Sequence, residues 1–142
     1  MTVVAGERHV KDTPQNRQLN AVKLAEDLSV YTTKICSNKN IFIEEYEDTT
    51  KDIVRTACNI YLKSFYANGI YVKDQESKEK RLKMQEEALD DCAMLVGNIN
   101  LAYRLFHLKM KKKRHWIKMT LDARSSIKGW HESDKKRYKK YE

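Results

Sequence analysis

The stretch "SKEKRLKMQEEALDDCAMLVGNINLAYRLF", residues 77–106, decides the fold class. Its apolar residues recur every three or four positions, which is the period of an α-helix with one buried face. The members of this stripe are Leu82, Ala88, Leu89, Cys92, Leu95, Val96, Ile99, Ala102, Tyr103 and Phe106. The pattern predicts one long amphipathic helix.

Three other segments have the same period. They run from about Leu19 to Cys36, from about Glu44 to Ala67, and from "KMKKKRHW" at 109–116 to Trp130. The last of them turns Trp116, Met119, Ala123, Ile127 and Trp130 inward. Four such helices joined by short links predict an all-α, antiparallel up-down four-helix bundle. We place the bundle at residues 17–130, after a flexible leader at 1–16 and before a basic helical extension or tail at 131–142.

The composition agrees with long helices. Of 142 residues, 34% are charged, and only four glycines and one proline are present, too few turn residues for a β-sandwich. Three cysteines without a CxxC pair exclude a zinc site or a thioredoxin-like pair and predict buried free thiols in a reducing compartment. The chain has neither an apolar run of the roughly 18 residues that span a membrane nor a signal-peptide pattern. We therefore expect a cytoplasmic protein with no membrane partner.

Motifs for catalysis or metal binding are absent from the sequence. It contains no Glu-x-x-His for a di-iron centre, no HExxH, no GxSxG and no glycine-rich phosphate loop. The four histidines have no companion at metal-ligand spacing. We therefore expect no enzymatic activity, no metal and no cofactor.

Positive charge is concentrated in the last quarter of the chain. Residues 1–108 hold 15 Lys and Arg against 16 Asp and Glu, whereas residues 109–142 hold 13 against 4, a net charge of +9. Charge segregated in this way indicates a surface that faces a polyanion.

The cations form three clusters, at 109–115, along the fourth helix at Lys118, Arg124 and Lys128, and at 135–140. The first, around "KMKKKRH", lies at the positive end of the fourth helix dipole, a locally unfavourable position that favours an anionic partner. The third is interleaved with Tyr138 and Tyr141, and cations beside aromatic rings suit single-stranded or irregular nucleic acid. The predicted nucleic-acid-binding residues are Lys111, Lys112, Lys113, Arg114, Lys118, Arg124, Lys128, Lys135, Lys136, Arg137, Lys139 and Lys140.

Other interpretations of this region remain open. The charged run can be a solvated tail, and a basic helix with tryptophan can lie on anionic lipid, although its apolar face is needed to close the bundle. Trp130 is expected in the core or a subunit interface rather than under a stacked base. Asp134 is expected to pair with a neighbouring cation, and Ser133 to cap a helical turn.

The ending "RSSIKGWHESDKKRY" resembles that of the Avd family, the accessory variability determinants of diversity-generating retroelements. The matching residues are Arg124, Ser125, Ser126, Ile127, Trp130, Ser133, Asp134, Arg137 and Tyr138. "KLAEDLSVYTTKICSNKNIF", "YANGIYV" and "KRLKMQEEALDDC" are also similar to family stretches, so that the resemblance covers roughly residues 19–141. Where that family has a basic turn before its second helix, this chain has the acidic "IFIEEYED".

The resemblance implies a barrel-like homopentamer of four-helix bundles with a basic surface. Such a protein associates with a retroelement reverse transcriptase and its template RNA, and it supports mutagenic complementary-DNA synthesis without catalysis of its own. Similar bundles are also encoded in ribosomal-RNA intervening sequences. A structural interaction bundle of that kind, without a specific nucleic-acid role, is the alternative function.

Overall fold

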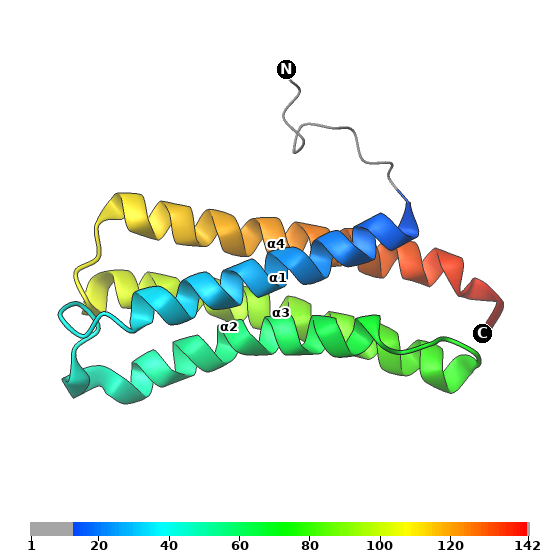
Figure 1. Ribbon diagram of the computed structural model, residues 1–142, viewed down its shortest axis with the longest axis horizontal. Helices are drawn as coiled ribbons and strands as arrows, with labels where there is room; N and C mark the ends of the chain where they lie inside the picture. Colours follow the sequence, from blue (N-terminus) through cyan, green and yellow to red (C-terminus); the bar gives the residue numbers. More distant parts are fainter. Residues whose placement is uncertain (1–12, 142) are drawn as a thin grey trace, which may run out of the picture.

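The computed structural model describes residues 13–141, which are helical apart from short links and contain no strand. Four long helices follow one another (Figure 1): α1 Pro14–Cys36, α2 Glu47–Asn68, α3 Gln75–Leu105 and α4 Met110–Arg137. Two short 3-10 helices, η2 Glu44–Tyr46 and η3 Lys139–Tyr141, precede α2 and follow α4. Most of the predicted leader, residues 1–12, lies outside the described part of the chain.

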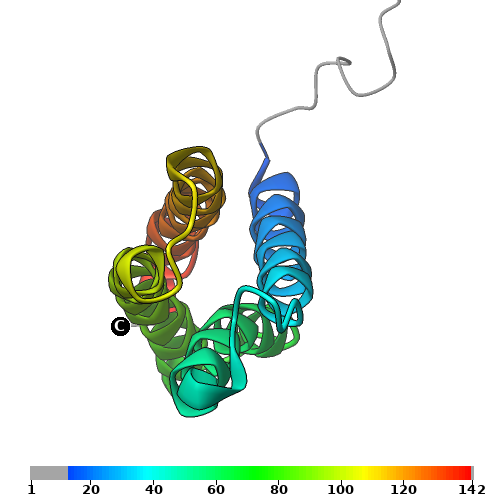
Figure 2. The ribbon, with the colours of Figure 1, turned by 90° about the vertical axis from the view of Figure 1, so that its left-hand side faces the viewer.

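Consecutive helices run in opposite directions. Each helix packs against two neighbours: α1 and α3 each contact α2 and α4, and Figure 2 shows the arrangement end-on. The predicted antiparallel four-helix bundle is confirmed. We call the end of the bundle with the links at 37–46 and 106–109 the head end (left in Figure 1). The opposite end is the tail end (right in Figure 1), where α1 begins, the link at 69–74 lies and α4 ends.

Two helices begin earlier than the spacing of apolar residues predicts, because side-chain caps fix their first turns. Thr13 Oγ1 accepts a hydrogen bond from the Asn16 backbone N–H at 3.2 Å, and Pro14 occupies the first turn, so α1 begins before Leu19. Asp74 Oδ1 accepts from the Ser77 backbone N–H at 2.8 Å in a reciprocal capping box, so α3 begins at Gln75.

The core is formed by the predicted helix faces. The fully buried members of the α3 stripe are Ala88, Cys92, Leu95, Ile99 and Ala102. On α4, Trp116 and Trp130 are fully buried, which confirms Trp130 as a core residue. All three cysteines are free; Cys36 and Cys92 are buried as expected, whereas Cys58 is half-buried.

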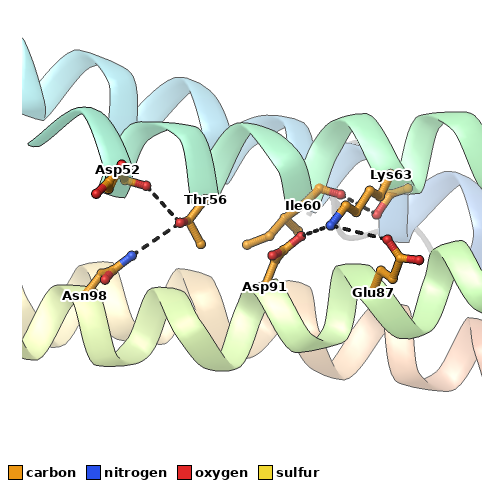
Figure 3. A network of polar contacts seen from close by, with 8 residues as sticks. Asp52, Thr56, Ile60, Lys63, Glu87, Asp91 and Asn98 are labelled. Carbon is orange, nitrogen blue, oxygen red and sulfur yellow. Dashed lines mark hydrogen bonds and ion pairs between the residues drawn. The ribbon is translucent and has the colours of Figure 1, made fainter. Parts of the chain in front are cut away.

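A polar seam joins α2 to α3 (Figure 3). Lys63 Nζ lies 2.7 Å from Asp91 Oδ2 and 3.6 Å from Glu87 Oε1, and farther along the seam Asn98 donates to Thr56 Oγ1 at 3.4 Å. The positive charge of Lys63 is compensated within the protein, because two carboxylates of α3 lie beside its ammonium group.

Among residues 13–141, no helix is both long and apolar enough to cross a membrane.

Candidate nucleic-acid interface

The last turns of α4 and the η3 segment present five exposed cations at the tail end. We call Lys135, Lys136, Arg137, Lys139 and Lys140 the tail cations. Within residues 13–141, none of them forms an ion pair with a carboxylate, unlike Lys63 in the seam. Three of them sit in the last turn of α4, where the negative end of the helix dipole stabilises positive charge. The protein therefore holds this charge at low local cost and leaves it available to an anion.

A buried ion pair fixes the position of these cations. Asp134 is fully buried one residue before them, and its Oδ2 accepts hydrogen bonds from Arg81 Nε and from Gln85 Nε2, each at 2.7 Å. The side chains of Arg81 and Asp134 are only 4% and 1% exposed. The end of α4 is thereby tied to α3, 53 residues away in the sequence. Asp134 does pair with a cation, although the partner belongs to another helix.

Arg81 extends this connection to the other helices of the tail end. Its Nη1 donates to the Ile70 carbonyl at 3.1 Å, and its Nη2 donates to Gln18 Oε1 at 2.9 Å. The guanidinium carbon lies 5.5 Å from the centre of the Trp130 ring and 5.6 Å from that of Tyr138. One side chain thus joins α1, the α2–α3 link and α4 directly under the tail cations.

A second contact ties α1 to α4. Arg17 Nη1 donates to Ser133 Oγ at 2.8 Å. The prediction that Ser133 caps a helical turn is wrong, because α4 continues through it to Arg137. Ser133 instead helps to hold two helices together.

Two hollows flank the end of α4. One of about 440 Å³ lies between α3 and α4 and is lined by Lys78, Leu82, Glu132, Lys135, Lys136 and Lys139. The other, of about 560 Å³, lies between α1 and α4 and is lined by Pro14, Arg17, Gly129, Glu132, Ser133, Lys136 and Arg137. Tail cations line both hollows, so the positive charge lies in two concave parts of the surface as well as on the exposed end of the helix.

The structure separates the predicted site residues into two groups. We call Lys111, Lys112, Lys113 and Arg114 the head cations; they lie in the first turns of α4 at the head end. With a helix rise of about 1.5 Å per residue, Lys112 and Lys136 are about 36 Å apart along α4. Between them, Lys118 pairs with Asp122 at 2.7 Å, whereas Arg124 and Lys128 are exposed. The twelve residues therefore do not form one compact site.

The head cations occupy the less favourable end of the helix. The Lys109 cap position makes no side-chain hydrogen bond to the helix, and no acidic residue lies in the first turn. Lys113 Nζ lies 4.4 Å from the centre of the Tyr103 ring. Positive charge here opposes the helix dipole.

Neutralising two head cations is therefore expected to stabilise the fold. Changing Lys111 and Lys112 to Gln should raise the free energy of unfolding by about 0.3–1 kcal/mol per residue at low salt. Changing Lys135 and Lys136 to Gln, the matched control at the other end of the same helix, should lower it by a similar amount. Urea denaturation of both variants measures the two signs, and equal signs would contradict the dipole argument.

The buried thiols do not provide a nucleophile. Burial raises the pKa of the Cys36 and Cys92 thiols to about 12 each, so both stay protonated at neutral pH. Within residues 13–141, no group of three or more His, Cys, Asp or Glu side chains is placed to hold a metal ion.

Sequence reasoning missed Arg81, Gln85 and the burial of Asp134. A signal was present, since Arg81 and Gln85 precede Ala88 and Cys92 at helical steps on the buried stripe of α3.

Comparisons of the chain with models of protein families, with curated proteins and with solved structures found no match. Functional inference therefore rests on the site and on the sequence pattern.

Proposed function

We propose that this protein is a non-enzymatic, cytoplasmic accessory bundle that binds single-stranded or irregular RNA, or RNA paired with complementary DNA, through its tail end. The observation that carries this proposal is the set of tail cations. They are unpaired with carboxylates in the described chain and stand directly after Asp134, which the buried pair with Arg81 immobilises. A backbone of closely spaced phosphates is the partner that matches such a fixed cluster of cations.

The tyrosines of the same segment favour nucleic acid over an acidic protein. Arg137 lies 5.0 Å from the centre of the Tyr138 ring, and Lys140 lies 5.2 Å from that of Tyr141. Each pair places a flat π-face beside a cation. Unpaired bases stack on such faces while neighbouring phosphates meet the charges.

The resemblance to the Avd family supplies the proposed setting. In it, the protein would bring template RNA to the reverse transcriptase of a diversity-generating retroelement and support mutagenic complementary-DNA synthesis. The reverse transcriptase would be its protein partner. A structural bundle like those encoded in ribosomal-RNA intervening sequences is the rival, and it requires no RNA affinity beyond that of any basic protein.

Exposed apolar side chains support the proposed homo-oligomer, for which the resemblance implies a pentamer. On α2, the exposed apolar residues Leu62, Phe65 and Tyr66 lie at helical steps of three and four on one face, which forms one patch. On α3, Met94 and Leu101 lie seven residues apart on one face, which forms a second patch. Contact between two different patches of identical subunits is heterologous, and such contacts close into a ring when the rotation between subunits permits.

The salt dependence of RNA affinity tests the proposal. The association constant of the intact protein for single-stranded RNA should fall steeply between about 50 and 200 mM salt. Each neutralised phosphate adds about 0.7 to the slope of log K against log salt, so five contacts give a slope of about 3.5. Fluorescence anisotropy at several salt concentrations measures it. Weak binding with a slope near zero would contradict the proposal and leave the rival.

A further inference from the structure

A third hollow, which we call the tail hollow, lies where the α2–α3 link meets the end of the chain. Its volume is about 510 Å³. It is lined by Gln18, Asn68, Gly69, Ile70, Tyr71, Val72, Arg81, Arg137, Tyr138, Lys140 and Tyr141. Its walls thus come from segments that are far apart in sequence and that Arg81 draws together through its bonds to Ile70 and Gln18.

The charge of the tail hollow differs from that of its two neighbours. Glu132 lines both hollows that flank α4, whereas among residues 13–141 no carboxylate lines the tail hollow. Asp134 compensates the Arg81 charge in the interior, which leaves Arg137 and Lys140 as the cations of the lining. Of the three hollows, the tail hollow is the best suited to hold an anionic group.

Aromatic rings form the other part of the lining. Tyr71 is 82% exposed, an unusual degree for so large a ring. The ring centres of Tyr138 and Tyr141 lie 6.4 Å apart, with their planes tilted by 44°. Gln18 Oε1 is held by Arg81 Nη2, so the amide NH₂ of Gln18 is the donor left for a ligand. Tyr71 presents an open ring, whereas Arg137 and Lys140 lie over the rings of Tyr138 and Tyr141. An open ring, a hydrogen-bond donor and two cations beside aromatic rings are together groups that recognise a nucleotide.

We propose that the tail hollow holds one unpaired nucleotide of the bound RNA, with its base against the tyrosine rings and its phosphate beside Arg137 and Lys140. The volume suits a ligand of this size, since small-molecule pockets measure about 300–1,000 Å³. This inference rests on the proposed function and assigns the base-dependent part of binding to one defined place in the fold.

Abasic RNA separates the two contributions. Affinity is measured for a short single-stranded RNA and for a strand of equal length that has the same phosphates but no bases. Stacking contributes about 1–3 kcal/mol per base, so the intact protein should bind the base-containing strand about 5- to 150-fold more tightly. Equal affinity for the two strands would overturn the inference while leaving the proposed function in place. Absence of binding to either strand would overturn both.

Tyrosine variants locate the effect. Changing Tyr71 or Tyr141 to Ala should remove most of the difference between the two strands without lowering affinity for the abasic strand. The matched control is Tyr46→Ala, because Tyr46 is also exposed, lies at the head end away from the tail cations, and is not part of the lining. A preference for bases that survives both lining variants, or that disappears equally in the control, would contradict the assignment.

Discussion

Replacing Asp134 by Ala is expected to lower the free energy of unfolding by about 3 kcal/mol, near the lower end of the range of about 3–5 for a broken buried ion pair. The change leaves the 4%-exposed Arg81 without its carboxylate and Gln85 Nε2 without its acceptor. Arg81 keeps its hydrogen bonds to Ile70 and Gln18, which is why we expect the lower end. Urea denaturation, with circular dichroism as the signal, measures the difference.

A double variant separates the ion pair from the shape of its site. Arg81→Met with Asp134→Leu replaces both charges by apolar side chains of similar length, and we expect most of the lost stability to return. Asp134 Oδ1 is covered and accepts no hydrogen bond within residues 13–141, so the native carboxylate is itself incompletely compensated. A double variant as unstable as Asp134→Ala would show that the site requires the charges.

This comparison indicates what the buried pair contributes. If apolar residues can replace the pair, its role is to place the chain rather than to add net stability. Here it fixes the direction of the last turn of α4, and the tail cations start at the next residue. We therefore interpret Arg81 and Asp134 as residues that position the candidate interface.

The apolar face of each helix could be predicted because a buried stripe repeats at the helical period. Cys92, Leu95 and Ile99 are fully buried as expected, and Trp116 and Trp130 face inward. The bundle follows from four such stripes joined by short links. Helix starts were less predictable, since Thr13 and Asp74 act through side-chain caps that the apolar pattern does not record.

The polar interior of the tail end was not predicted, because a charged residue is assigned to the surface unless its partner is known. The helical spacing places Arg81 on the buried stripe of α3, but nothing local to "KRLKMQ" indicates that Asp134 of α4 is its partner. The tail hollow was missed for the same reason. Its walls come from Gly69–Val72 and from Arg137–Tyr141, and only the folded bundle brings these segments together.

The position of charge along α4 predicts unequal roles for its two ends. Changing Lys135, Lys136, Arg137 and Lys139 to Gln should lower the slope of log K against log salt for single-stranded RNA by about 2.8, or 0.7 per lost phosphate contact. The matched control changes the head cations to Gln, which also removes three lysines and one arginine. That variant should keep most of the slope, since the head cations lie about 36 Å away along the helix.

The matched pair distinguishes a site from a net charge. The protein has a formal net charge of +8, and both variants reduce it to +4. If RNA responded only to overall charge, the two variants would lose affinity equally. If the RNA instead contacts the cations that follow Asp134, the tail variant loses far more, although its net charge is the same. A larger loss in the head variant would move the interface to the opposite end of the bundle. It would also separate RNA binding from the Arg81–Asp134 pair, because that pair positions only the tail end.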